Sequence, residues 1–171
     1  MNTINPRIGI LMGSDSDWEV MSAAAQRLDA FEVPYEVTVT SAHRAPQRTA
    51  AYATSARERG LQVLICGAGM AAHLAGVVAA HTTLPVIGVP LEAGSLHGWD
   101  ALLATVQMPP GVPVATVTVG KAGAENAAIL AVQILGLTDG ELQRRLVEFK
   151  ATLARQVEEK DARLQQQRRR T

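Results

Sequence analysis

The chain has 171 residues, a length that suffices for one domain with its own hydrophobic core. Its formal net charge is zero, which argues against a nucleic-acid-binding surface, and its single cysteine excludes an intrachain disulfide. Apolar residues make up 47% of the chain but aromatic residues only 4%, so we expect a core of Ala, Val, Leu and Ile.

Short apolar runs alternate with helical patterns along the whole chain. Strands are predicted at residues 7–12, 35–40, 63–66, 85–89 and 114–119. Helices are predicted at residues 18–31, 46–59, 70–81, 99–106 and 122–135. The strands are apolar throughout rather than alternating, as expected when helices cover both faces of a parallel sheet.

These elements predict an α/β fold: a three-layer, doubly wound parallel sheet of about five strands, flavodoxin-like, with an extra C-terminal helix. We expect a single domain over residues 1–171, with a core at about 7–137 and the last helix at about 139–165. Asp139 is the expected cap of that helix, and the polar stretch beyond Glu158 is expected to fray.

The loop Gly13-Ser14-Asp15-Ser16-Asp17 follows the first strand and precedes a helix. Free N–H groups at a helix start bind anions, so Ser14 and Ser16 are candidate phosphate donors, or else simply caps. A carboxylate repels phosphate, so Asp17 is expected to accept from sugar hydroxyls or to cap the helix. The two acids could also hold Mg²⁺, but only Glu92 adds an acidic group in the other loops, which disfavours a metal.

The loop Ser41-Ala42-His43-Arg44 follows the second strand and places an imidazole beside a guanidinium. Arg44 can bind phosphate with two donors, and His43 can transfer a proton near neutral pH. A structural role for His43 is the alternative. Because ligands bind at the carboxyl ends of such strands, this loop is a candidate part of the site.

The stretch Gly67–Ala72 matches the dinucleotide pattern G-x-G-x-x-A, although it follows the third strand rather than the first. A pocket lined by backbone and kept open by small side chains is the simpler interpretation. His73 lies just beyond and is expected either to point into this pocket or to pack. Cys66 is interpreted as a small core residue.

The predicted helix at residues 70–81 has no charged side chain, so both of its faces need cover. A second subunit is the expected cover, which predicts an oligomer. The last helix is expected to pack either on its own domain or across a subunit boundary, and composition does not distinguish the two.

The longest stretch of low charge, residues 63–89, is interrupted by glycines, a proline and two histidines. We therefore do not interpret it as a membrane span. The first residues show no apolar targeting run, so a cytoplasmic location without membrane contact is expected.

Six motifs occur in order along the chain: Gly13-Ser14-Asp15-Ser16-Asp17, Ser41-Ala42-His43-Arg44, Ala68-Gly69-Met70-Ala71-Ala72-His73-Leu74, Pro85-Val86-Ile87-Gly88-Val89-Pro90, Val106-Gln107-Met108-Pro109 and Asn126-Ala127-Ala128. With them, residues 7–155 closely resemble the N5-carboxyaminoimidazole ribonucleotide mutase family of de novo purine synthesis, in its bacterial class. Two small departures are Ala75, where the family often has Pro, and Met70, where Gly is also common.

The resemblance implies transfer of a carboxylate from the exocyclic nitrogen of an aminoimidazole ribonucleotide to ring carbon four, through decarboxylation and recapture of trapped CO2. It implies no metal and no organic cofactor. His43 matches the family's proton-transferring histidine. The implied substrate-binding residues are Ser14, Ser16, Asp17, Ser41, Arg44, Ala68, Gly69, Met70, Ala71 and His73. The family is octameric, with sites shared between subunits, which would account for the uncharged helix.

Two other functions are alternatives to the mutase. One is a direct, CO2-dependent aminoimidazole ribonucleotide carboxylase. The other is a non-catalytic nucleotide- or flavin-binding module on the same fold, although the few aromatic residues argue against a flavin site. A receiver-type signalling domain is set aside, because Cys66-Gly67 stands where an acceptor Asp is needed.

Overall fold

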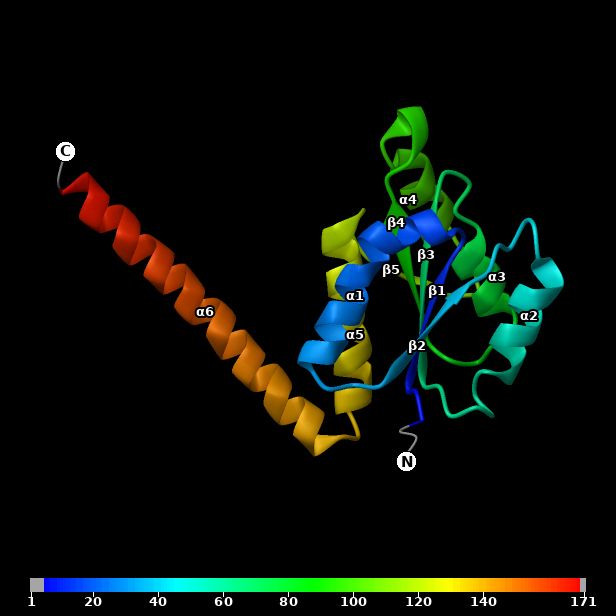
Figure 1. The fold of residues 1–171 in the computed structure, drawn as a ribbon, viewed down its shortest axis with the longest axis horizontal. Coiled ribbons are helices and arrows are strands. Elements are labelled where there is room, and N and C mark those ends of the chain that lie inside the picture. The colour runs from blue at the N-terminus through cyan, green and yellow to red at the C-terminus, as the bar shows by residue number, and fades with distance from the viewer. Residues whose placement is uncertain (1–4, 170–171) are drawn as a thin grey trace.

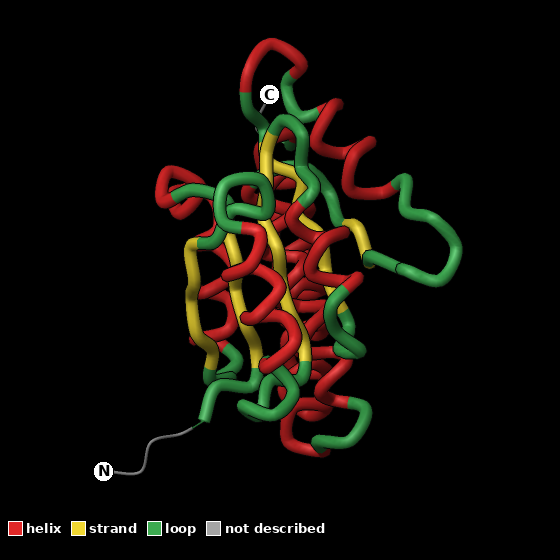
Figure 2. The backbone as a smooth tube through the Cα atoms, turned by 90° about the vertical axis from the view of Figure 1, so that its right-hand side faces the viewer, coloured by secondary structure: helices red, strands yellow, loops and turns green. Residues whose placement is uncertain are grey.

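A five-stranded parallel sheet forms the centre of the protein in the computed structural model, which describes residues 5–169. The strands are β1 (Ile8–Met12), β2 (Tyr35–Val39), β3 (Val63–Gly69), β4 (Val86–Leu91) and β5 (Ala115–Thr116). Their spatial order is β2-β1-β3-β4-β5, and every neighbouring pair is parallel. The strands lie side by side in one sheet (Figure 2). The predicted doubly wound, flavodoxin-like fold is confirmed.

Helices cover both faces of the sheet (Figure 1). On one face lie α1 (Trp18–Ala30) and α5 (Lys121–Gly136), and on the other α2 (Pro46–Ser55) and α3 (Leu74–Ala80). The shorter α4 (Trp99–Val106) packs near β4 and β5. Two single-turn 3₁₀ helices, η1 (Asp15–Asp17) and η2 (Gly94–Leu96), lie in the loops after β1 and β4.

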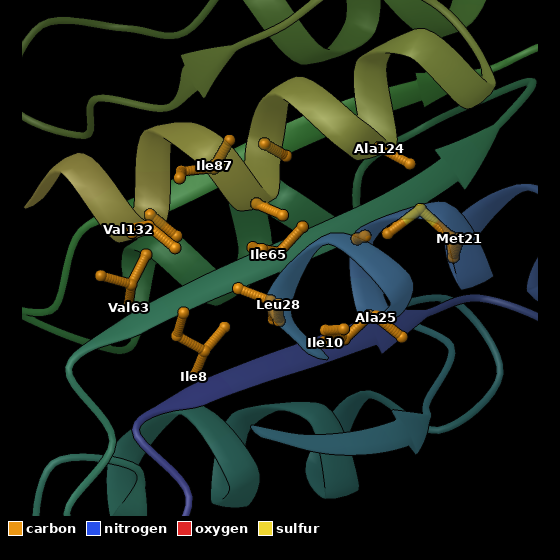
Figure 3. Packing of buried hydrophobic residues seen from close by; sticks show 14 of the residues in the cluster. Ile8, Ile10, Met21, Ala25, Leu28, Val63, Ile65, Ile87, Ala124 and Val132 are labelled. Atoms are coloured by element: carbon orange, nitrogen blue, oxygen red, sulfur yellow. The ribbon is translucent and has the colours of Figure 1, made fainter. Parts of the chain in front are cut away.

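Successive residues of each central strand point into different cores. Ile8 and Ile10 of β1 pack among the residues of α1 and α5 (Figure 3). Leu11 instead joins the cluster under α2 and α3. In β3, Ile65 faces the first cluster and Leu64 the second. This two-sided burial explains why the sequences of the central strands β1, β3 and β4 contain no charged residue.

The boundaries of the connection from β3 to α3 differ from the sequence prediction. The strand was expected to end at Cys66 and the helix to begin at Met70, but β3 continues to Gly69 and α3 begins at Leu74. The extra strand residues exist because Gly69 pairs with Leu91 of β4. Met70 then takes the left-handed conformation, with φ of 53°, which turns the chain away from the sheet.

The other predicted elements differ mainly in length. The helix expected at residues 46–59 is regular only to Ser55, and the strand expected at 114–119 pairs with β4 only at Ala115–Thr116. Beyond that pair, the N–H of Val117 still donates to the carbonyl of Gly88 at 3.1 Å. Residues 117–120 therefore follow β4 without forming a regular ladder.

The last helix, α6 (Gly140–Arg168), begins on the domain and then extends away from it (Figure 1). Asp139 caps it as predicted, because its Oδ1 accepts from the N–H of Leu142 at 3.2 Å. Phe149 packs edge-on against Phe31, with ring centroids 5.5 Å apart, so the first half of α6 packs on its own chain.

The second half of α6 extends into solvent. Fraying was expected beyond Glu158, but this segment is helical to Arg168, since it consists mostly of Glu, Lys, Arg, Gln and Leu, which are strong helix formers. Val157 and Leu164 are 66% and 52% exposed. Within residues 5–169, no helix combines the length and the apolar character that crossing a membrane requires.

Candidate functional site

A pocket of about 420 Å³ opens at the carboxyl ends of β1, β2 and β3. All eleven residues that the sequence pointed to for catalysis or binding are among those that line it. The lining residues are Gly13, Ser14, Ser16, Asp17, Ser41, Ala42, His43, Arg44, Ala68, Gly69, Met70, Ala71, His73, Leu74 and Ala93. Residues at the ends of β1, β2, β3 and β4, far apart in the sequence, therefore build one site, as expected from the topology of the sheet.

The loop after β1 is held by a reciprocal cap. The Oδ2 atom of Asp17 accepts from the N–H of Ser14 at 3.0 Å, and the N–H of Ser16 donates to Ser14 Oγ at 3.4 Å. This pattern arises because Ser and Asp stand three residues apart at the start of a helical segment. Asp17 thus adopts the capping role, one of the two roles that its sequence position allowed.

The carboxyl group of Asp17 is partly removed from water. This burial raises the pKa of Asp17 above its ordinary value of 3.8, although backbone N–H groups of Ser14 and Gly13 and the charge of Arg44 act in the opposite direction. A partly buried carboxylate of this kind can also accept hydrogen bonds from ligand hydroxyls in the pocket.

The two serines of this loop pair with each other. Ser16 Oγ donates to Ser14 Oγ at 2.9 Å, and Ser14 Oγ donates to Asp15 Oδ1 at 3.2 Å. Hydroxyl groups rotate at little cost, so both can turn toward an anion in the pocket. The loop therefore combines two adaptable donors with the first N–H groups of a helical segment.

The loop after β2 places Arg44 against the loop after β1. Arg44 Nη2 donates to the carbonyl oxygen of Gly13 at 3.1 Å, and its backbone N–H donates to Ser41 Oγ at 3.2 Å. No carboxylate forms a salt bridge with Arg44 anywhere in residues 5–169. Its charge remains available to an anionic ligand.

His43 and His73 meet across the pocket. The distance from His43 Nε2 to His73 Nδ1 is 2.8 Å, and the two rings lie edge to face at 84°. A hydrogen bond between two imidazoles needs a hydrogen on one nitrogen and a lone pair on the other, so each ring restricts the tautomer of its partner. His43 is exposed to the pocket and thus accessible for proton transfer.

The end of β3 and the loop that follows it supply small side chains and backbone to the floor of the pocket. Ala68, Gly69 and Ala71 line the pocket, and Met70 is 59% exposed at its edge. Gly69 is required by close packing, because a Cβ atom there would lie 2.9 Å from Ala93 Cβ. This part of the pocket can hold a small or planar group but offers few side-chain donors.

Four lining residues were not among the predicted site residues: Gly13, Ala42, Leu74 and Ala93. Ala93 follows β4, so the rule that ligands bind at the carboxyl ends of strands could have identified it. Glu92 and His97, which lie in the same loop, form an exposed pair at 3.1 Å and do not line the pocket.

Two further sequence interpretations concern cysteine and metal binding. Cys66 is fully buried in β3, and burial raises the pKa of its thiol, as expected for a core residue. Over residues 5–169, no three His, Cys, Asp or Glu side chains are grouped so that they could hold a metal ion.

Known proteins are similar to this chain over nearly its whole length. A family model described as AIR carboxylase matches residues 7–156. N5-carboxyaminoimidazole ribonucleotide mutase from Mycobacterium tuberculosis is 58% identical over 94% of this chain and 91% of its own length. The mutase of that name from Bacillus subtilis is also 58% identical, over 85% of this chain and 90% of its own.

Solved structures show the same fold. The crystal structure of Treponema denticola PurE superposes with a TM-score of 0.84 at 28% identity, covering 93% of this chain and 98% of that one. A second crystal structure, of a substituted PurE2 from Treponema denticola, gives a TM-score of 0.85 at 26% identity, covering 94% of this chain and 99% of that one.

Proposed function

The chain belongs to the AIR carboxylase family, and from this premise we propose that it catalyses the reaction for which its mutase relatives are named. The substrate is N5-carboxyaminoimidazole ribonucleotide, and its carboxylate moves from the exocyclic nitrogen to ring carbon four in purine synthesis. The observation that carries the proposal is the 58% identity to such a mutase over 94% of the chain.

The proposed reaction has three steps. The N-carboxylate leaves as CO2 while the exocyclic nitrogen takes up a proton, which gives aminoimidazole ribonucleotide, and the nucleophilic ring carbon then attacks that CO2. The proton on the attacked carbon must finally leave. His43 is the proposed proton-transfer residue, since its imidazole is accessible from the pocket and ordered by His73 at 2.8 Å.

The proposed phosphate contacts are Ser14, Ser16, Ser41 and Arg44. The arrangement of donors supports this role, because the two hydroxyls of the β1 loop and the unpaired charge of Arg44 border the same pocket. Asp17 is proposed to accept from ribose hydroxyls. Binding energy from these contacts would hold the imidazole ring in place against CO2.

The proposed CO2 site is the floor from Ala68 to Ala71, near His73. CO2 is uncharged and binds weakly, so the site must hold it by confinement and by excluding water. The small side chains leave space for CO2, and backbone N–H groups can stabilise the carboxylate charge that develops. No metal or organic cofactor takes part in the proposed mechanism.

Confinement also supports a proposed assembly of several subunits. In the single chain the pocket is open, with Met70 59% exposed at its edge. Trp99 and Leu103 of α4 are 67% and 53% exposed, which is unusual for side chains of this size. We propose a homo-octamer with sites closed at subunit interfaces, and light scattering coupled to gel filtration would test this assembly. We also propose a cytoplasmic location.

The decisive assay supplies purified protein with N5-carboxyaminoimidazole ribonucleotide, with and without bicarbonate. A mutase forms the carbon-carboxylated product at the same rate in both, whereas strict dependence on bicarbonate would instead establish a direct carboxylase. The carboxylase remains the second candidate because the matching family model carries that description. Binding without turnover would favour a non-catalytic nucleotide module, and an absorbance band in the visible would identify a flavin protein.

A further inference from the structure

A second hollow, of about 390 Å³, lies beside the candidate site on the other side of the same two loops. It shares Gly13, Ser14, Ser41 and Arg44 with the first pocket. The loops after β1 and β2 therefore form a wall with a cavity on each side. A group bound against this wall is influenced by charges in both cavities.

Arg44 connects the two loops within the shared wall. Its Nη2 donates to the Gly13 carbonyl at 3.1 Å, and its Nε lies 3.5 Å from Ser41 Oγ. The guanidinium thus contacts both loops that form the wall. An anion that binds to Arg44 from the candidate site lies close to the second hollow as well.

The second hollow contributes one more cation, Arg48, from the first turn of α2. Arg48 is exposed, and its side chain forms no hydrogen bond or ion pair with any residue from 5 to 169. By contrast, Arg59 on the same side of the sheet pairs with Glu36 at 2.5 Å. An unpaired guanidinium has no ion pair to break when it attracts an incoming anion.

The carboxylate that lines this hollow is already engaged. Asp15 Oδ1 accepts from Ser14 Oγ at 3.2 Å and from the N–H of Ser16 at 3.0 Å. Its charge offsets part of the positive potential but does not pair with Arg48. Arg44 and Arg48 together carry two positive charges, which match the charge of about −1.5 to −2 on a phosphate monoester at neutral pH.

We propose that Arg48 is a specificity-determining residue that favours a phosphorylated nucleotide over the uncharged nucleoside. It acts by charge across the shared wall, while Arg44 makes the direct contact. This inference rests on the proposed function, because it takes the ligand to be a nucleoside 5′-monophosphate. It adds a residue of the second hollow to the recognition of that ligand.

The test is calorimetric binding of 5-aminoimidazole ribonucleotide and of its nucleoside to wild type and to Arg48→Gln. The variant should bind the nucleotide roughly 3- to 10-fold more weakly at low salt, and the deficit should shrink at high salt because ions screen exposed charges. Nucleoside affinity should change less than about twofold. Arg57→Gln is the matched control, since Arg57 is also exposed and unpaired within residues 5–169 but follows the opposite end of α2.

Three results would overturn the inference: equal nucleotide binding by Arg48→Gln and wild type, equal losses for nucleotide and nucleoside, or the same loss in Arg57→Gln. None of these would affect the mutase proposal if wild type converts its substrate. Conversely, wild type that binds the nucleotide but does not turn over N5-carboxyaminoimidazole ribonucleotide contradicts the mutase proposal, and the binding comparison still decides the role of Arg48. Failure of wild type to bind the nucleotide contradicts both.

Discussion

The imidazole of His43 lies 2.8 Å from that of His73, nitrogen to nitrogen, although the two residues follow different strands. His43 comes from the loop after β2 and His73 from the end of the loop after β3. Since β1 lies between these strands, the contact spans the site from one side to the other. The two rings act as one unit in which each orients the other.

The first prediction concerns His43 itself. His43→Asn should lower turnover of the carboxylated nucleotide by about 10²- to 10⁴-fold, the usual contribution of a general acid–base group. The dissociation constant of the nucleotide should change little, because the phosphate contacts remain. His97→Asn, an exposed histidine outside the pocket, is the control and should keep full activity. Near-normal turnover of His43→Asn would remove His43 from the mechanism.

The second prediction separates orientation from direct chemistry at His73. The side-chain amide of an asparagine can stand about where Nδ1 of histidine stands, so His73→Asn should preserve the contact to His43 and most of the turnover. His73→Ala removes the contact and should lower kcat roughly 10-fold or more, with a smaller effect on KM. Equal losses in both variants would show that His73 does more than orient His43.

The third prediction concerns Arg44. Arg44→Ala should raise the dissociation constant of the nucleotide about 10- to 100-fold, the usual contribution of a hydrogen bond to a charged group. The nucleoside without phosphate should bind almost as well as it does to wild type. An unchanged nucleotide affinity, measured by calorimetry, would place the phosphate elsewhere.

Much of this site follows from the order of elements in the sequence. Apolar runs that end in Gly13, Ser41 and Gly67 indicate parallel strands, and parallel strands bring their carboxyl ends to one edge. The contact between His43 and His73 could not be predicted in the same way. His73 follows Met70, whose left-handed conformation the sequence does not signal because Met rarely adopts it.

The course of the last helix was also only partly predictable. Its apolar stripe indicates a packed face, and Leu142 and Phe149 do pack on the chain's own domain. Beyond Phe149, hydrophobicity alone does not predict whether the helix faces solvent or packs on a neighbouring chain. The structure shows that this part of α6 extends away from the domain (Figure 1).

The fourth prediction is a pH dependence of stability from Asp17. Burial raises the pKa of this carboxyl in the folded chain above 3.8, so between these two pKa values the folded state binds more protons than the unfolded state. The free energy of unfolding contributed by Asp17 should therefore fall as pH rises through this window and stay level above it. Asp17→Asn removes this contribution.

The measurement is urea unfolding of wild type and Asp17→Asn at several pH values between about 3.5 and 7. The stability of wild type relative to the variant should decrease with rising pH. Ser16→Ala, which changes the same loop without a titrating group, should give a difference that does not vary with pH. A relative stability of wild type over Asp17→Asn that increases with pH would contradict the assignment.

The last prediction tests the close approach of α5 to the end of the sheet. A Cβ atom on Gly123 would collide with the backbone carbonyl of Thr118, and backbone cannot rotate away as a side chain can. Gly123→Ala should therefore destabilise the chain by roughly 1–3 kcal/mol, despite the better helix propensity of alanine. Gly140→Ala is the matched control, because nothing lies within 4 Å of its added Cβ in the first turn of α6. It should be neutral or stabilising by up to about 1 kcal/mol, and equal effects of the two substitutions in chemical denaturation would contradict the packing argument.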